Sequence, residues 1–86
     1  MPLSVVRLTL GNERDSPHVV LIEPWACDYT LFTGENLTIE AHGDEATPWF
    51  QIIEWEGVTQ IYCEETDDFR VLQGDVELES GHNRQA

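Results

Sequence analysis

The sequence predicts an all-β fold, a small antiparallel β-sandwich or open barrel of about seven or eight short strands. Apolar and polar residues alternate along several segments, as in strands with one buried face. Turn residues recur at short intervals, and no stretch carries apolar residues at helical spacing. The chain of 86 residues has room for one domain. We expect that domain to span residues 1–79, and residues 80–86 to form a flexible polar tail.

The first strands are predicted in the N-terminal third of the chain. Residues 6–10 place alternate apolar side chains on one face, and a polar loop follows over residues 11–17. Residues 19–22 are a continuous apolar run, which is typical of a short strand buried on both faces.

Alternation returns in the middle of the chain. A turn over residues 33–36 leads into residues 37–42, where small and aliphatic side chains alternate with polar ones. The loop over residues 43–48 ends in a proline, a residue that can begin an edge strand.

The C-terminal half contains the clearest hairpin. Residues 49–56 and 58–63 are rich in aromatic and β-branched residues, which fit a pleated sheet. Glu56 and Gly57 separate the two patterns by a two-residue turn in which Gly57 is expected to have positive φ. The acidic residues 64–68 form either a loop or one helical turn. After a turn at residues 73–75, residues 75–79 alternate again and predict a last strand.

The charge of the chain is strongly acidic. Seventeen carboxylates face four arginines and no lysine, which gives a net charge of −13. Proteins that bind nucleic acid or anionic membranes use basic residues for the contact, so we expect neither partner. Exposed carboxylates also repel one another, so added salt should raise the stability of the fold.

The chain carries no basic segment followed by an apolar one, and its longest apolar run is residues 19–22. A cytoplasmic location is therefore expected. In a reducing compartment Cys27 and Cys63 should be free buried thiols, with a single disulfide between them as the alternative.

One segment carries a recognisable pattern. It consists of Glu23-Pro24-Trp25, Asp28-Tyr29, Leu31 and Gly34-Glu35. This pattern resembles that of small bacterial β-domain proteins of unknown function with E-P-W…(D/E)-Y-x-L-x-x-G-E. The resemblance covers about residues 19–42, implies a compact β domain and supplies no activity. Ala26 and Cys27 stand where those proteins have a glycine and an acidic residue.

No metal or cofactor site is predicted. The single methionine is Met1 and no histidine closely follows either cysteine, so a blue-copper site is not expected. The histidines and cysteines also lack the close pairs of a zinc site, and we expect His18 and His42 in loops or on an exposed strand face. Several acids could supply oxygens to calcium, but they lack the D-x-D-x-D-G pattern. These acids are Glu64, Glu65, Asp67 and Asp68.

Catalysis finds little support either. None of the serines lies in a G-x-S-x-G turn, and carboxylate pairs such as Glu54 and Glu56 are expected by chance in so acidic a chain. Neighbouring carboxylates should raise the pKa of Cys63 and keep it unreactive. We therefore expect a protein that is not an enzyme.

The aromatic residues allow two interpretations. Most should fill the core, but Trp49 and Trp55 are six residues apart and share one face of their strand, opposite Phe50 and Ile52. One of these faces points away from a single core. A candidate interaction surface therefore comprises Trp49, Trp55, Val58 and Tyr62.

These observations favour a non-catalytic interaction domain that binds a protein partner or itself, most simply as a homodimer. Two alternatives stay open at this level. A row of outward-facing acids could imitate nucleic acid and inhibit its binding proteins, or Trp49 and Trp55 could stack on sugar rings. The row would comprise Glu40, Glu54, Glu56, Asp75, Glu77 and Glu79.

Overall fold

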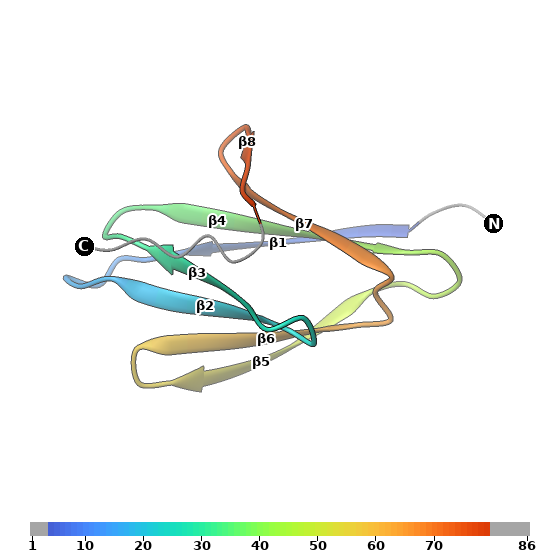
Figure 1. The fold of residues 1–86 in the computed structure, drawn as a ribbon, viewed down its shortest axis with the longest axis horizontal. Coiled ribbons are helices and arrows are strands. Elements are labelled where there is room, and N and C mark those ends of the chain that lie inside the picture. The colour runs from blue at the N-terminus through green and yellow to red at the C-terminus, as the bar shows by residue number, and fades with distance from the viewer. Residues whose placement is uncertain (1–3, 80–86) are drawn as a thin grey trace.

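The computed structural model describes residues 4–79, which form two stacked sheets and no helix (Figure 1). The strands are β1 (Ser4–Gly11), β2 (His18–Glu23), β3 (Cys27–Leu31), β4 (Asn36–Gly43), β5 (Trp49–Trp55), β6 (Val58–Glu64), β7 (Asp68–Gln73) and β8 (Val76–Glu77). This part of the chain thus has no helix long and apolar enough to cross a membrane. The predicted tail over residues 80–86 lies outside the described residues.

The strands divide into two open sheets, and the predicted all-β class is confirmed. Sheet A has the order β1-β4-β7-β8 and sheet B the order β3-β2-β6-β5, so neither closes into a barrel. All neighbouring strands run antiparallel except β2 and β6, which are parallel. A parallel pair needs a long crossover connection, and here the chain visits sheet A through β4 before it returns.

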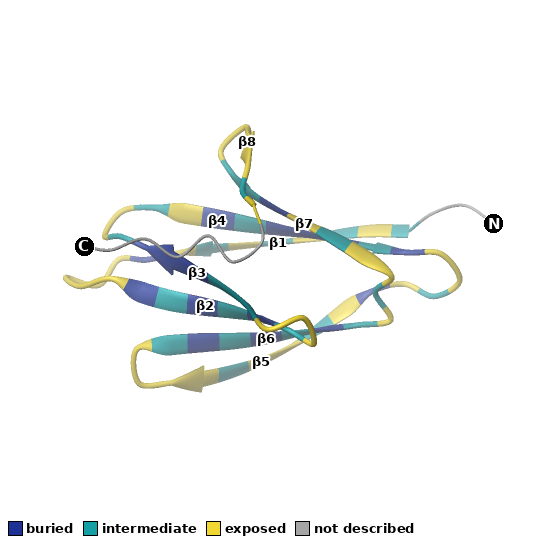
Figure 2. Cartoon of the chain, in the orientation of Figure 1, coloured by how far each residue is buried: buried dark blue, intermediate teal, exposed yellow. Residues whose placement is uncertain are grey.

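The core lies between the two sheets, and buried residues alternate with more exposed ones along several strands (Figure 2). The alternation arises because successive residues of a strand point to opposite faces. The buried set consists of Val20, Ile22, Tyr29, Leu31, Leu37, Ile39, Ile61, Cys63 and Val71. Residues 19–22 are not buried on both faces as predicted, since Val19 and Leu21 are only half-buried on the outer face of sheet B.

The predicted hairpin between β5 and β6 is confirmed. Trp55 pairs with Val58, and Gly57 has a φ of 80°. That left-handed conformation strains any residue with a Cβ. The acidic segment before β7 is a loop rather than a helical turn, with Glu65 at a φ of 52°. The last predicted strand is shorter than expected and covers only β8.

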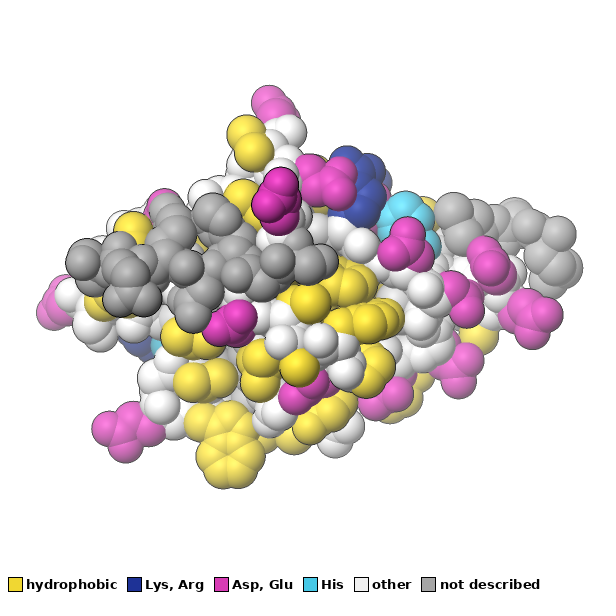
Figure 3. All heavy atoms as spheres, in the orientation of Figure 1, with side chains coloured by type: hydrophobic (Ala, Val, Ile, Leu, Met, Phe, Trp, Pro, Cys, Tyr) yellow, Lys and Arg dark blue, Asp and Glu magenta, His cyan; other side chains and the backbone are white. Residues whose placement is uncertain are grey.

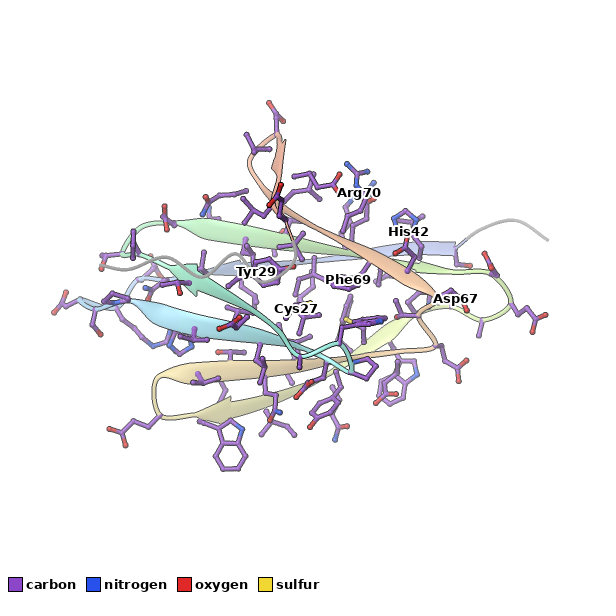
Figure 4. All side chains as sticks on the ribbon, in the orientation of Figure 1. Cys27, Tyr29, His42, Asp67, Phe69 and Arg70 are labelled. Carbon is purple, nitrogen blue, oxygen red and sulfur yellow. The ribbon has the colours of Figure 1, made fainter. Side chains whose placement is uncertain are left out.

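An aromatic contact links the connection between β2 and β3 to strand β7. The connection before β3 contains the Glu23-Pro24-Trp25 segment, in which the Glu23–Pro24 peptide bond is cis. The ring of Trp25 stacks on that of Phe69 in β7, with centroids 4.3 Å apart and planes 24° apart. Figure 4 shows Phe69 between the sheets beside Cys27 and Tyr29. This stack joins the β2–β3 turn of sheet B to sheet A across one side of the sandwich.

Candidate interaction surface

The outer face of sheet B carries most of the exposed aromatic area. Strand β5 turns Trp49, Ile53 and Trp55 to this side, because their neighbours Phe50 and Ile52 are in register with the buried Cys63 and Ile61. Strands β6 and β2 extend the same face. We call this surface the aromatic face, made of Trp49, Ile53, Trp55, Val58, Tyr62, Val19 and Leu21. In Figure 3, apolar side chains gather between the two sheets and along sheet B, whereas a histidine and an arginine stand over sheet A.

All four residues of the predicted surface lie on the aromatic face. Trp49 is 54% exposed and Trp55 is 62% exposed, so the core interpretation is wrong for both indoles. Val58 and Tyr62 are half-buried between their neighbours in the sheet. Periodicity alone places the two tryptophans on the same side of β5, but only the stacking of the sheets puts that side outside.

A chain of hydrogen bonds orients one of the indoles. Trp55 Nε1 donates to Gln60 Oε1 at 3.0 Å, and Gln60 Nε2 donates to Glu23 Oε2 at 2.9 Å. These side chains come from β5, β6 and β2, so the chain crosses the sheet. The ring of Trp55 is therefore held in place at the end of its strand while most of its surface stays in water.

Strand β5 also has a free backbone edge, because it ends the order of sheet B among residues 4–79. Val19 N donates to Gly57 O at 3.1 Å, so the odd residues of β6 bond toward β2 and the even ones toward β5. Trp55 and Val58, which flank the two-residue turn, then form a hydrogen-bonded pair. It follows that the backbone groups of Phe50, Ile52 and Glu54 point to the free edge.

The side chains along this edge are mostly uncharged. Ile52 is 47% exposed on the inner side of the sheet, where it extends past the core. Glu54 is the one charged residue of β5. Its carboxylate accepts a hydrogen bond from Thr59 Oγ1 at 2.7 Å and lies 3.6 Å from Arg14 Nη2. The negative charge of this edge is therefore partly compensated.

A buried histidine is linked to this edge strand through Thr59, and its position differs from the prediction. His18 is 3% exposed at the start of β2, rather than in a loop or on an exposed face. Its Nε2 lies 2.7 Å from Thr59 Oγ1, and because that hydroxyl donates its proton to Glu54, the imidazole must donate. Nδ1 is buried without a partner. Burial, followed by the charge of Arg14, lowers the pKa of His18 below 6.5.

The arrangement of His18, Thr59 and Glu54 is not that of an activated nucleophile. In a catalytic pair the histidine accepts the proton of the hydroxyl, whereas here the hydroxyl of Thr59 donates to a carboxylate and is 4% exposed. No sequence motif signals this contact, since 41 residues separate His18 from Thr59.

The outer face of sheet A is organised by charge. Glu40 is 6% exposed, although it lies on the outside of β4, because its neighbours cover it. Its carboxylate meets Arg7 Nε at 2.9 Å, Arg70 Nη1 at 3.2 Å and His42 Nε2 at 2.8 Å. These hydrogen bonds, above all that from His42, lower the pKa of Glu40 below 4.5. Arg70 Nε also meets Glu77 at 3.0 Å. Figure 4 shows Arg70 and His42 on this outer side.

A hollow of about 360 Å³ contains only two of the four acids that could supply oxygens to calcium, Glu65 and Asp67. It is lined by Asp44, Glu45, Ala46, Glu65 and Asp67. Asp67 accepts a hydrogen bond from the backbone N of Asp44 at 2.8 Å, which occupies part of its carboxylate. Over residues 4–79, no group of three or more histidine, cysteine, aspartate or glutamate side chains has the geometry of a metal site.

Both cysteines are free, although Cys27 is half-buried rather than buried as expected. Cys63 is buried, and burial followed by the charge of Glu64 raises its pKa to about 11. The expected direction is therefore confirmed, with burial rather than the neighbouring carboxylate as the larger cause. Cys63 therefore lacks the lowered pKa that a reactive cysteine needs.

Comparison with protein-family models, with curated proteins and with solved structures finds no match to this chain.

Proposed function

We propose that this protein is a non-catalytic interaction domain that associates with a second copy of itself through β5 and the adjoining aromatic face. One observation carries the proposal. Two tryptophans, more than half exposed, stand at the two ends of an edge strand whose outward backbone groups have no partner strand among the described residues. Long, apolar strand edges are sites at which chains pair, and monomeric proteins usually protect them with charges, prolines or bulges.

The energetics support an interface at this place. A fully buried aromatic side chain removes about 150–250 Å² from water, at about 25 cal/mol per Å². Covering the exposed half of Trp49 and of Trp55 is therefore worth roughly 2 kcal/mol each. Tryptophan is also enriched among the residues that dominate binding energy at interfaces.

The charge distribution supports the same surface. A net charge of −13 repels a second copy, so association requires a region with little charge. Strand β5 is such a region, because its single acid, Glu54, lies beside Arg14. On the other long edge strand, β1, Val5 is the one large apolar side chain that is exposed.

The thiols and one hydroxyl support a cytoplasmic location and a non-catalytic role. Two free cysteines fit a reducing compartment, which favours the cytoplasm as the place of action. The hydroxyl of Thr59 is committed to Glu54 and the thiol of Cys63 is protonated at neutral pH, which favours a role without nucleophilic catalysis.

The two alternatives have less support. A nucleic-acid mimic needs a continuous row of free carboxylates, but Glu40 is covered by two arginines and Glu54 lies on the other sheet. A sugar platform needs aromatic rings close together. Six residues of strand separate Trp49 from Trp55 by about 20 Å, so they cannot stack on one sugar ring.

Analytical ultracentrifugation over a range of protein concentrations tests the proposal. We expect a reversible dimer that the double substitution Trp49→Ala and Trp55→Ala weakens by at least about 10-fold in Kd. The matched control is Val5→Thr, which changes a residue of sheet A that is 40% exposed and should leave Kd unchanged. A wild-type protein that stays monomeric at high concentration and moderate salt would refute self-association.

A further inference from the structure

We propose that β5 pairs antiparallel with β5 of a second copy about a two-fold axis at Ile52, so that the two B sheets form one continuous sheet. This inference rests on the proposed self-association and specifies its geometry. A two-fold interface brings the same surface of both subunits together, and an unpaired strand can satisfy that condition by pairing with itself.

The backbone defines the register. The free N–H and C=O groups of β5 belong to Phe50, Ile52 and Glu54, as deduced from the pairing of β6 with its two neighbours. An axis at Ile52 places Phe50 opposite the partner's Glu54 and Ile52 opposite its own copy. Every free group of the strand then has a hydrogen-bonding partner. Any other axis that keeps the faces aligned leaves some of these groups without one.

The side chains agree with the same register. Opposite residues on paired strands point to the same face, so Trp49 lies opposite the partner's Trp55 on the outer side, and the reverse. These positions are non-hydrogen-bonded pairs, in which the side chains approach most closely. The axis therefore creates two cross-strand tryptophan pairs from indoles that are now 54% and 62% exposed. On the inner side, Ile52 covers its own copy.

The charges also select this register. The axis at Ile52 places Glu54 opposite the partner's Phe50, with Arg14 beside it. An axis at Glu54 would instead set this carboxylate against its own copy, and like charges directly opposite are destabilising. The large negative charge of each subunit still opposes association over longer distances, so the dimer should tighten as salt is added.

Disulfide trapping measures the register directly. Gln51 and the partner's Ile53 are opposite each other in the proposed dimer, at a non-hydrogen-bonded pair whose Cα separation of about 4.5 Å suits a disulfide. We would prepare Gln51→Cys and Ile53→Cys, each with Cys27→Ser and carrying tags of different mass. The buried Cys63 is retained, since its pKa of about 11 keeps it unreactive.

Three samples distinguish the possible registers: the two variants mixed, and each variant alone. An axis at Ile52 predicts rapid cross-linking when the two variants are mixed, and little in either variant alone. Cross-linking of Gln51→Cys with itself would indicate an axis at residue 51, and that of Ile53→Cys an axis at residue 53, so either result overturns the proposed register. A dimer that cross-links in no mixture also overturns it, while the proposed self-association stands. A wild-type protein that stays monomeric refutes both the register and the self-association.

A proline substitution provides a second readout. The N–H of Ile52 points to the free edge, so Ile52→Pro removes no hydrogen bond of the monomer but blocks pairing at the axis. We expect a folded monomer by circular dichroism, with Kd raised by at least about 10-fold. The comparison variant is Ile53→Pro, whose lost N–H bonds to β6, and it should unfold the hairpin. A dimer that survives Ile52→Pro with unchanged Kd contradicts edge pairing.

Discussion

The two outer faces of the sandwich differ in how far their exposed groups are satisfied within the subunit. On sheet A, Arg7 and Arg70 enclose the carboxylate of Glu40, so polar groups satisfy one another and the face needs no partner. On sheet B, Trp49 and Trp55 stand exposed beside an unpaired strand edge. Both faces come from the same alternation of strand residues. The difference teaches that an outer face becomes a candidate binding site when its side chains leave area and backbone groups unsatisfied.

The largest effect should come from straining one hairpin on each sheet. Gly57 joins β5 to β6 at a φ of 80°, and Gly74 joins β7 to β8 at a φ of 62°, with open space around both. A valine in left-handed conformation costs roughly 2 kcal/mol, so both Gly57→Val and Gly74→Val should lower the denaturant midpoint. Only Gly57→Val should also weaken the dimer, because it alone distorts β5. Equal dimer Kd values for the two variants would contradict an interface formed by sheet B and not by sheet A.

A somewhat smaller effect should follow from uncharging the centre of sheet A. Glu40→Gln keeps the shape of the side chain but removes the carboxylate that Arg7, Arg70 and His42 share. We expect a loss of about 1–2 kcal/mol in the free energy of unfolding, because charge-assisted hydrogen bonds are lost from a covered position. Chemical denaturation measures this loss, and sedimentation should show an unchanged dimer. A weakened dimer would mean that the two faces are coupled.

Acid should affect the two sheets in separate pH ranges. The pKa of His18 in sheet B is lowered from 6.5, so the unfolded chain binds the proton first and stability falls as the pH drops below 6.5. The slope from this one group is at most about 1.4 kcal/mol per pH unit. The pKa of Glu40 in sheet A is lowered from 4.5, so its contribution is present above pH 4.5 and disappears as the pH falls through the folded value.

Two substitutions separate these ranges in urea titrations at a series of pH values. His18→Gln retains a donor toward Thr59 but does not titrate, so it should flatten the stability curve just below pH 6.5. Glu40→Gln should lower the stability by a constant amount above about pH 4.5 and change the slope of the curve only below it. If His18→Gln leaves the slope below pH 6.5 unchanged, His18 is not the group that titrates there.

The smallest effect should come from salt. With seventeen carboxylates and four arginines, screening reduces repulsion over the whole surface, so moderate NaCl should raise the melting temperature of the monomer. The increase should be smaller in Glu40→Gln than in wild type if removing this carboxylate also reduces the net repulsion. A thermal melt of the monomeric variant Ile52→Pro isolates this effect from dimerisation. A melting temperature that does not rise with salt would show that repulsion does not limit stability.

Local properties of the chain account for much of the fold. Alternation over residues 37–42, the turn residue Gly57 and the neighbouring β-branched segments predict strands and a hairpin, because these features depend on residues close in sequence. The same periodicity places Trp49 and Trp55 on one side of β5, since residues six apart in a strand share a face.

Other features depend on which strands become neighbours. Whether the Trp49 side faces core or water is decided when sheet A covers the Phe50 side of β5. His18 becomes buried because β6 brings Thr59 beside it, and Glu40 because β1 and β7 bring an arginine from each side. These contacts join residues about 30 to 41 positions apart. Strand periodicity carries no information about such distant pairings, because it constrains only the direction of each side chain relative to its own backbone.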